Sequence, residues 1–253
     1  MKRLVMRRTR VCVTALVAVV GGMALSVTGG SGAASVDPPR WVLKGPYVPS
    51  LDPLDFVARV DNRYLPLVPG TAFHYRGYSG MTPQTDDMVV TRQTKVVLGI
   101  RCTVVRDTVS EHGTPVERTF DWYAQDKQGN VWYLGENSLE RKNERFVRAD
   151  DSWQAGVDGA KAGIVMKANP RPGDVYRQEY YPPGGALDQA LVLRTRPTIT
   201  VPHGSYRRTL ATVEWSPVEP QLERKYYVAG LGEVAEQVVQ GGHERFQLVS
   251  VTS

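Results

Sequence analysis

Hydrophobic and polar positions alternate in short runs from about residue 70 to the end of the chain, and most runs stop at Gly, Pro or Asn. Alternation with a period of two, in runs rich in Val, Thr, Tyr and Trp, is typical of half-buried β-strands. The predicted strands are 71–78, 87–98, 101–110, 115–125, 130–136, 144–150, 174–181, 189–201, 205–215, 222–229 and 232–251. The pattern predicts at most one short helix, within 154–168.

The connections between these runs are short, for example "EHGT", "DKQGN" and "AGLG". Short connections force neighbouring strands to run antiparallel. The sequence therefore predicts an all-β fold made of antiparallel meanders, with little helix. It leaves open whether the meanders form a curved sheet, a barrel or a sandwich.

Two parts of the chain resemble each other at a nearly constant offset. "PGTAFHYRGY" from Pro69 resembles "PGDVYRQEYY" from Pro172, and "WYAQDKQGNVWYLGE" from Trp122 resembles "YYVAGLGEVAEQV" from Tyr226, with offsets of 103 and 104. We therefore expect two duplicated halves of about 100 residues each, although antiparallel strands of similar length also resemble one another. The expected organisation is a signal peptide (1–34), a Pro-rich extended lead-in (35–60), a first half (61–150), a connecting segment (151–168) and a second half (169–253).

The predicted hairpin Phe120–Glu136, "FDWYAQDKQGNVWYLGE", gathers four large aromatic side chains. Because side chains alternate along a strand, Trp122 should lie on one face and Tyr123 on the other, and likewise Trp132 and Tyr133. Both faces of this hairpin must then be at least partly covered. The aromatic residues could form a pocket wall or belong to the packed core.

The N-terminus has the order of a secretory signal. A basic head, "MKRLVMRRTR", precedes an apolar run over 11–27 and the small residues "TGGSGAAS". We expect cleavage near Ala33 or Ala34 and a secreted or cell-surface protein; an uncleaved anchor is the alternative. The general secretory route fits better than the twin-arginine route. No second apolar segment predicts a membrane span after cleavage.

The basic charge of the whole chain comes from this leader. Five of the 31 Lys and Arg residues lie within 1–34, which leaves 26 basic against 26 acidic residues. Nothing in this balance predicts nucleic-acid binding. Cys102 is the one cysteine after the leader, so no intramolecular disulfide is expected, and its alternation with Ile100 and Val104 predicts a small buried side chain.

Several segments carry a resemblance to a known family. The runs "DNRYLPLVPGTAFHYRG", "TKVVLGIRCTVVRDTV", "FDWYAQDKQGNVWYLGE", "GVDGAKAGIVM", "PGDVYRQEYY" and "KYYVAGLGEVAE" are similar to those of exported, β-rich bacterial proteins, mostly actinobacterial, with no assigned activity. The similarity spans about residues 55–250. It implies export and a β-rich fold, and it implies no catalytic residue or cofactor.

Motifs of common catalytic and cofactor sites are absent from the sequence, so no cofactor or metal is predicted. His74 on a strand could act as a general base or simply be an exposed strand residue. Asp121 and Glu179 lie among aromatic residues, where a carboxyl pKa can rise, but strand carboxylates more often pair with a cross-strand Arg. Asp150, Asp151 and Asp158 match no established calcium loop, and a solvated turn is the better interpretation.

The leading hypothesis is an exported, non-catalytic β-protein that binds a small apolar molecule, a lipid or a cell-envelope component. The alternatives are a structural or protein-interaction module of the envelope, and an enzyme of the hydrolase or cyclase-barrel type that uses His74, Asp121 and Glu179. The candidate ligand-binding residues are His74, Arg76, Asp121, Tyr123, Trp132, Arg177, Glu179 and Tyr226. An apolar cavity of several hundred Å³ would favour the leading hypothesis.

Overall fold

The computed structural model describes residues 42–253, and this part of the chain is almost entirely β-structure. The strands are β1 (Phe56–Val57), β2 (Val60–Asn62), β3 (Leu65–Leu67), β4 (Ala72–Ser79), β5 (Thr82–Val97), β6 (Ile100–Glu111), β7 (Thr114–Asp126), β8 (Val131–Lys142), β9 (Arg145–Arg148), β10 (Trp153–Gln154), β11 (Lys161–Met166), β12 (Val175–Arg177), β13 (Glu179–Tyr180), β14 (Gln189–Val192), β15 (Ile199–Val201), β16 (Gly204–Tyr206), β17 (Leu210–Trp215), β18 (Leu222–Val228), β19 (Gly232–Gln240) and β20 (Glu244–Thr252). Two 3-10 turns, η1 (Pro53–Asp55) and η2 (Pro182–Gly184), complete the described elements.

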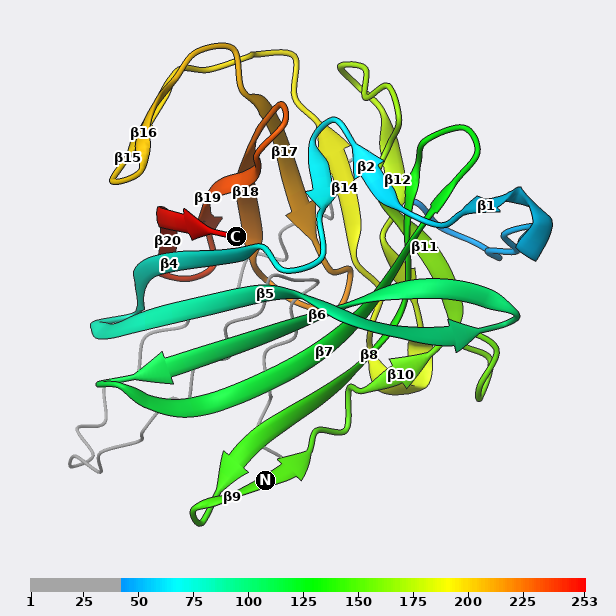
Figure 1. Cartoon of the computed structure of the whole chain (residues 1–253), viewed down its shortest axis with the longest axis horizontal. Helices are drawn as coiled ribbons and strands as arrows, with labels where there is room; N and C mark the ends of the chain where they lie inside the picture. Colours follow the sequence, from blue (N-terminus) through cyan, green and yellow to red (C-terminus); the bar gives the residue numbers. More distant parts are fainter. Residues whose placement is uncertain (1–41) are drawn as a thin grey trace, which may run out of the picture.

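One large antiparallel sheet contains most of these strands and curves until it is nearly closed into a barrel (Figure 1). Its order is β12-β14-β17-β18-β19-β20-β4-β5-β6-β7-β8-β11-β13. The runs β4 to β8 and β17 to β20 follow the chain, whereas β20 meets β4 from the far end of the chain, and β12 and β13 lie at opposite ends of the order. The prediction of an all-β antiparallel fold is confirmed. Of the three architectures that the sequence left undecided, the protein adopts the one closest to a barrel. The short connections seen in the sequence explain this up-and-down order.

The two ends of the sheet meet in one stretch of chain. β12 pairs with β14, and β13, only one residue further on, pairs with β11. Between them, the backbone N–H of Gln178 donates to the carbonyl of Asp188. On the opposite side of the sheet, β20 pairs along most of its length with β4. Closure leaves few unpaired backbone groups along the main sheet.

The N-terminal stretch of the described chain lies on the outside of this closing segment. The guanidinium of Arg177 donates to the carbonyls of Leu43 (2.9 Å) and Gly45 (3.2 Å) and lies over the rings of Tyr47 and Tyr180. The Tyr47 hydroxyl donates to the carbonyl of Ala162 on β11. Residues 43–47 of the lead-in thus form hydrogen bonds with β12 at one end of the sheet and with β11 near the other end.

Most of the expected strands are present, but several differ in extent. The expected strands 174–181, 189–201, 205–215 and 232–251 are each split into two, and β5 and β8 are longer than expected. Segment 154–168 contains β11 and the end of β10 where a short helix was predicted. The helix prediction is wrong because this stretch pairs with β8 and β13. Gly163 makes the close approach possible, since a Cβ there would lie 2.3 Å from the backbone carbon of Gln178.

Two expectations stay untested. The signal peptide and the first part of the lead-in lie outside the described residues. The duplication also stays a prediction. In the sheet order, the expected first half supplies the consecutive strands β4 to β8, and the expected second half supplies β12, β14, β17, β18, β19 and β20.

Cys102 is buried, as its alternation with apolar neighbours predicted. Burial raises the pKa of its thiol to about 12, against the opposing effects of a backbone hydrogen bond at Val97 and the charge of Lys95. The side chain is therefore a neutral, shielded thiol.

We predict that Cys102 in residues 35–253 reacts slowly with a thiol reagent such as DTNB at about pH 8, because thiolate is scarce and the side chain is covered. In denaturant the same thiol should react at the rate of a free cysteine. Stopped-flow absorbance measures both rates. A native rate equal to the denatured rate would contradict the placement of Cys102.

Candidate functional site

The inner face of the barrel is filled by tyrosine and charged side chains. Tyr75 on β4 donates its hydroxyl to the carbonyl of Glu233 on β19, and Tyr133 on β8 donates to Asp121 Oδ1 on β7 at 2.7 Å. Tyr123 stacks on Tyr133 with ring centroids 5.0 Å apart. The two contacts of Tyr133 join the neighbouring strands β7 and β8, and the Tyr75 bond reaches past β20 to β19.

Lys225 on β18 is the buried cation at the centre of this inner network. Its ammonium lies 3.3 Å from Glu214 Oε2 and 3.8 Å from Glu236 Oε2, and its side chain is 3% exposed. Glu214 also accepts hydrogen bonds from Gln178 and Tyr227. Burial alone would lower the pKa of Lys225, but the surrounding glutamates raise it, so the ammonium stays charged.

Two inner carboxyl groups, those of Glu136 and Glu233, favour their neutral form, in contrast to the charged ammonium of Lys225. Burial, with the nearby charges of Asp151, Asp121 and Glu179, raises the pKa of Glu136 well above its ordinary value. Burial is also the largest cause of the raised pKa of Glu233, although Lys225 works against it. Buried carboxyl groups close to other carboxylates favour the protonated form.

Three of the predicted site residues meet in this network. Asp121 and Tyr123 are buried inner residues of β7, and Glu179 on β13 is near enough to contribute to the raised pKa of Tyr133 and of Glu136. Their role in ligand binding stays a prediction. The contacts described above tie them to the packed interior.

The other predicted residues lie elsewhere. His74 and Arg76 are on the outer face of β4, where His74 Nδ1 is 2.6 Å from Asp87 Oδ1. Tyr226 is half-buried on β18, opposite Ala211 and Ala235.

Trp132 and Arg177 each have structural contacts on the outer face. The Trp132 indole donates to Asp126 Oδ2 at 2.8 Å, and its ring meets the edge of Phe56. Arg177 holds the lead-in as described above. The eight predicted residues are thus distributed over several places, and His74 lies apart from Asp121 and Glu179.

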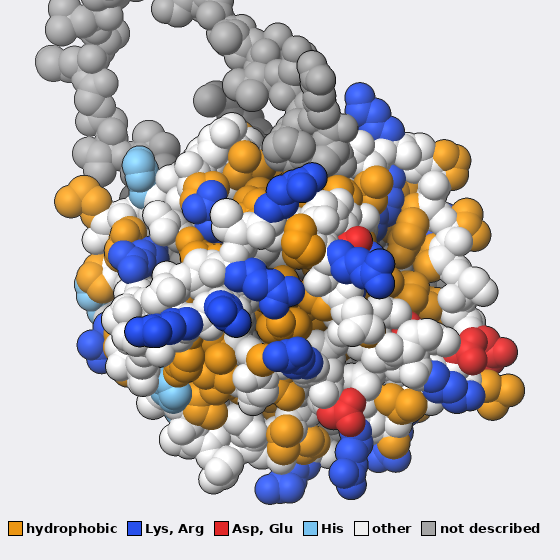
Figure 2. Space-filling model, turned by 90° about the horizontal axis from the view of Figure 1, so that it is seen from above, with side chains coloured by type: hydrophobic (Ala, Val, Ile, Leu, Met, Phe, Trp, Pro, Cys, Tyr) orange, Lys and Arg blue, Asp and Glu red, His pale blue; other side chains and the backbone are white. Residues whose placement is uncertain are grey.

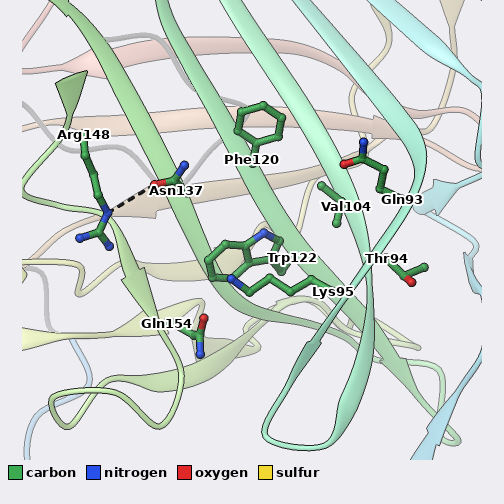
Figure 3. Close-up of a pocket in the computed structure, with 9 residues that line it drawn as sticks. All are labelled: Gln93, Thr94, Lys95, Val104, Phe120, Trp122, Asn137, Arg148 and Gln154. Carbon is green, nitrogen blue, oxygen red and sulfur yellow. Dashed lines mark hydrogen bonds between the residues drawn. The ribbon is translucent and has the colours of Figure 1, made fainter. Parts of the chain in front are cut away.

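The outer face of β5–β8 carries a hollow of about 490 Å³, which we call the outer groove (Figure 3). Its walls come from β5, β6, β7, β8, β9 and β10. The lining residues are Gln93, Thr94, Lys95, Val104, Phe120, Trp122, Asn137, Arg148 and Gln154. They comprise two cations, three amides, a hydroxyl and an apolar floor, and they include no carboxylate.

Alternation along β7 explains why this floor is aromatic. Trp122 pairs with Val104 and Phe120 pairs with Arg106, whereas Asp121 and Tyr123 between and beyond them point inward. The division of the hairpin's aromatic residues between the two faces is therefore confirmed. One set packs the interior, and the other forms the base of the outer groove.

The two cations of the outer groove lie close to each other. The Lys95 ammonium is 3.5 Å from the centroid of the Trp122 ring, a cation–π contact. Arg148 donates from Nε to Asn137 Oδ1 at 3.3 Å (Figure 3). Its Nη2 donates to the carbonyl of Ser152, also at 3.3 Å. Burial, opposed by Cys102 and aided by the positive charge of Arg148, lowers the pKa of Lys95. Within residues 42–253, neither cation forms a salt bridge.

A second hollow of about 390 Å³ adjoins the outer groove. It shares Arg148 and Gln154 with it, and Trp153, Asp150, Asp158 and Tyr181 are among its other lining residues. The two hollows therefore lie side by side, with Arg148 and Gln154 at their border. Asp150 and Asp158 line it, but the described residues contain no cluster of three or more His, Cys, Asp or Glu side chains able to hold a metal ion.

Sequence reasoning missed most of this groove. Arg148 belongs to "LERKNERFVRADD", whose alternating charges are typical of a solvated ribbon, and neither Arg148 nor Lys95 was among the candidate residues. Trp122 and Phe120 were noticed only as part of an aromatic hairpin. The lining residues come from six strands, so no local spacing could have joined them.

Comparisons with known proteins give weak likenesses only. No protein-family model matches the chain, and no curated protein sequence does. A solved structure provisionally described as an exported protein with a YmcC-like fold, from Bacteroides fragilis, is 14% identical, covers 76% of this chain and 100% of its own, and has a TM-score of 0.39. A second, provisionally described as a lipoprotein from Parabacteroides distasonis, is 12% identical, covers 76% and 99%, and has a TM-score of 0.34.

The first neighbour is described as an exported protein and the second as a lipoprotein. Export of this chain and its actinobacterial origin stay predictions. Within residues 42–253, neither helical turn has the length or the apolar character that a membrane-crossing helix requires.

We predict that Lys225→Met lowers the free energy of unfolding by about 3–5 kcal/mol, because it leaves buried carboxylates without their cation. Urea denaturation measures the change. The control is Lys142→Met, which removes an exposed ion pair with Glu140 at 2.8 Å and should cost about 1 kcal/mol or less. Equal, small effects of both changes would contradict the role given to Lys225.

We predict that Glu136→Gln weakens the dependence of stability on pH. The raised pKa of Glu136 means that folding favours its protonated form, so this contribution is present below the ordinary carboxyl pKa and is lost as the pH rises through the raised one. The wild-type free energy of unfolding should fall relative to the variant by up to about 1.4 kcal/mol per pH unit in that window.

Urea denaturation of both proteins at a series of pH values from mildly acidic to neutral measures this difference. Glu144→Gln, at an exposed position, is the control and should leave the difference from wild type independent of pH. A Glu136→Gln curve parallel to the wild-type curve would show that Glu136 is ionised in the folded protein at these pH values.

Proposed function

We propose that this protein is exported and acts, without catalysis, as a binding protein for a component of the cell envelope, which it holds in the outer groove. The groove itself carries the proposal: a hollow of about 490 Å³ with an aromatic floor, three amide side chains and two cations without salt-bridge partners among the described residues. Concave sites with a few convergent polar groups are where small ligands and chain segments usually bind.

Export rests on the leader. The basic head, the apolar run and the small residues that follow it form a secretory signal pattern. A protein with this leader would meet the components of the cell envelope, and its ligand would then come from there. Neither a cofactor nor a metal enters the proposal.

A small apolar ligand inside the barrel is less well supported. The inner face is occupied by Tyr75, Tyr123, Tyr133 and the network around Lys225. The two large hollows described above lie elsewhere and are lined largely by polar and charged side chains. The outer groove therefore suits a polar ligand better than an apolar one.

A catalytic function is also less well supported. The enzyme hypothesis requires His74, Asp121 and Glu179 to share one site, whereas His74 pairs with Asp87 on the outer face and the two acids lie on the inner face. The residues that line the outer groove include cations and amides but no carboxylate or histidine that could act as a general base.

Native mass spectrometry of residues 35–253, purified from the host that secretes them, tests the proposal. We expect a retained molecule that is lost from the double variant Lys95→Gln/Arg148→Gln, while Lys142→Gln keeps it. Circular dichroism should show that all three proteins are folded. A retained molecule that persists in the double variant places the site elsewhere, and a clean apo mass for the wild type contradicts a tightly held ligand.

A further inference from the structure

Resting on the proposed function, we propose that the outer groove binds an extended glycan chain that carries carboxylate groups. A carboxylate of the glycan pairs with Lys95 and Arg148. Its hydroxyl groups exchange hydrogen bonds with the amide side chains of Gln93, Asn137 and Gln154. The occupant is thus an acidic polysaccharide.

Charge complementarity is the first argument. The Lys95 ammonium and the Arg148 guanidinium lie close enough for Arg148 to disfavour the charged form of Lys95. Arg148 donates from Nε and Nη2 only, to neutral oxygens, so Nη1 remains available to a ligand. One carboxylate between the two cations would remove their repulsion and form charge-assisted hydrogen bonds.

Because side chains alternate between the two faces of β6–β8, further positive charge lies on the outer face beside Lys95 and Arg148. Asp107, Glu117, Asp121 and Glu136 alternate onto the inner face. Arg106 and Arg118 alternate onto the outer face, opposite Phe120 and Leu139 respectively.

Arg118 adds a free donor to this outer face. Its guanidinium lies 4.9 Å from the ring of Phe146, and its Nε is buried without an acceptor among the described residues. Across the sheet, Leu139 separates Arg118 from Arg148, so the three residues form one row. The row offers a path of positive charge to a polyanion. Figure 2, which views another side of the molecule, likewise shows many Lys and Arg and few Asp and Glu side chains.

Shape is the second argument. The outer groove adjoins a second hollow, and Arg148 and Gln154 line both, so the two together offer an extended surface. An extended chain fits such a surface better than a compact molecule does. Asp150 and Asp158 in the second hollow can accept hydrogen bonds from sugar hydroxyls.

A peptide fits the same surface less well. Strands β6, β7 and β8 are paired on both sides, whereas β5 pairs with β4 only over residues 82–89. A peptide could therefore add as a strand only at the edge of β5 beyond Val90, and not across the floor of the groove. Trp122, which lies beneath the Lys95 ammonium, is 6% exposed, and Val104 is 5% exposed, so no open apolar pocket is ready for an anchoring side chain.

Isothermal titration of residues 35–253 against a panel of carboxylated glycan fragments tests the inference. The panel contains oligogalacturonate, oligomannuronate, hyaluronate and heparosan fragments, and methyl-esterified oligogalacturonate is the matched neutral probe. We expect binding to at least one acidic fragment, weakening with added salt and accompanied by a change in tryptophan fluorescence.

The variants Lys95→Gln and Arg148→Gln should each weaken this binding about tenfold or more, because each removes one charged partner of the carboxylate. The controls are Lys142→Gln and Arg207→Gln, which remove exposed cations outside the groove and should leave the affinity within about twofold. Thermal unfolding of all variants confirms that they are folded.

Three outcomes would overturn the inference: no binding to any acidic fragment, equal binding of the acid and its methyl ester, or an affinity insensitive to Lys95→Gln and Arg148→Gln. The proposed function can fail separately. If native mass spectrometry finds a neutral molecule or a peptide that the double variant loses, the envelope-binding function stands and the glycan is wrong. If native mass spectrometry finds no bound molecule and isothermal titration detects no binding to any fragment, both the envelope-binding function and the glycan inference would be overturned.

Discussion

Closure of the sheet is the constraint on which the other features depend. Because β12 and β13 are two parts of one stretch of chain and pair with opposite ends of the sheet, the meander bends round into a barrel. A closed sheet has an inside, and whatever points inward must be packed and must satisfy its polar atoms there. Tyrosine hydroxyls, the Lys225 ammonium and the carboxyl groups around them meet that requirement by bonding to one another.

The same alternation that fills the inside also builds the outside. On β7, Asp121 and Tyr123 enter the interior while Phe120 and Trp122 appear on the opposite face. A single strand thus contributes to the buried network and to the floor of the outer groove. A substitution that shifted the register of β7 by one residue would exchange these two sets and would damage both at once.

Much of the fold could be predicted from the sequence, because a period of two is a local property. The ranges of β4, β6, β7 and β18 were close to those observed, and the sides taken by Trp122 and Tyr123 were right. The strand β11 was missed because its small residues have no clear period, and Gly163 is explained only by the backbone of Gln178 against it. The barrel could not be chosen over a sandwich, since closure depends on pairings between distant strands.

The candidate site could be predicted far less well. Polar residues in an aromatic stretch drew attention to Asp121 and Tyr123, which the structure places in the interior. The groove residues Lys95 and Arg148 come from β5 and β9, and their meeting depends on curvature and on a bulge in β5 between Val90 and Thr94. Neither is visible in a linear pattern.

The pairing of β20 with β4 also governs the order in which the molecule can assemble. These strands are separated by most of the described chain, and we expect their contact to form late because a long loop must first close. Until residue 252 is available, β4 keeps an open edge that can pair with other chains. A protein threaded through a membrane from its N-terminus would therefore emerge with its first hairpins already able to form but with the ring incomplete. The compartment that receives it must keep that open edge from aggregating until the last strand arrives.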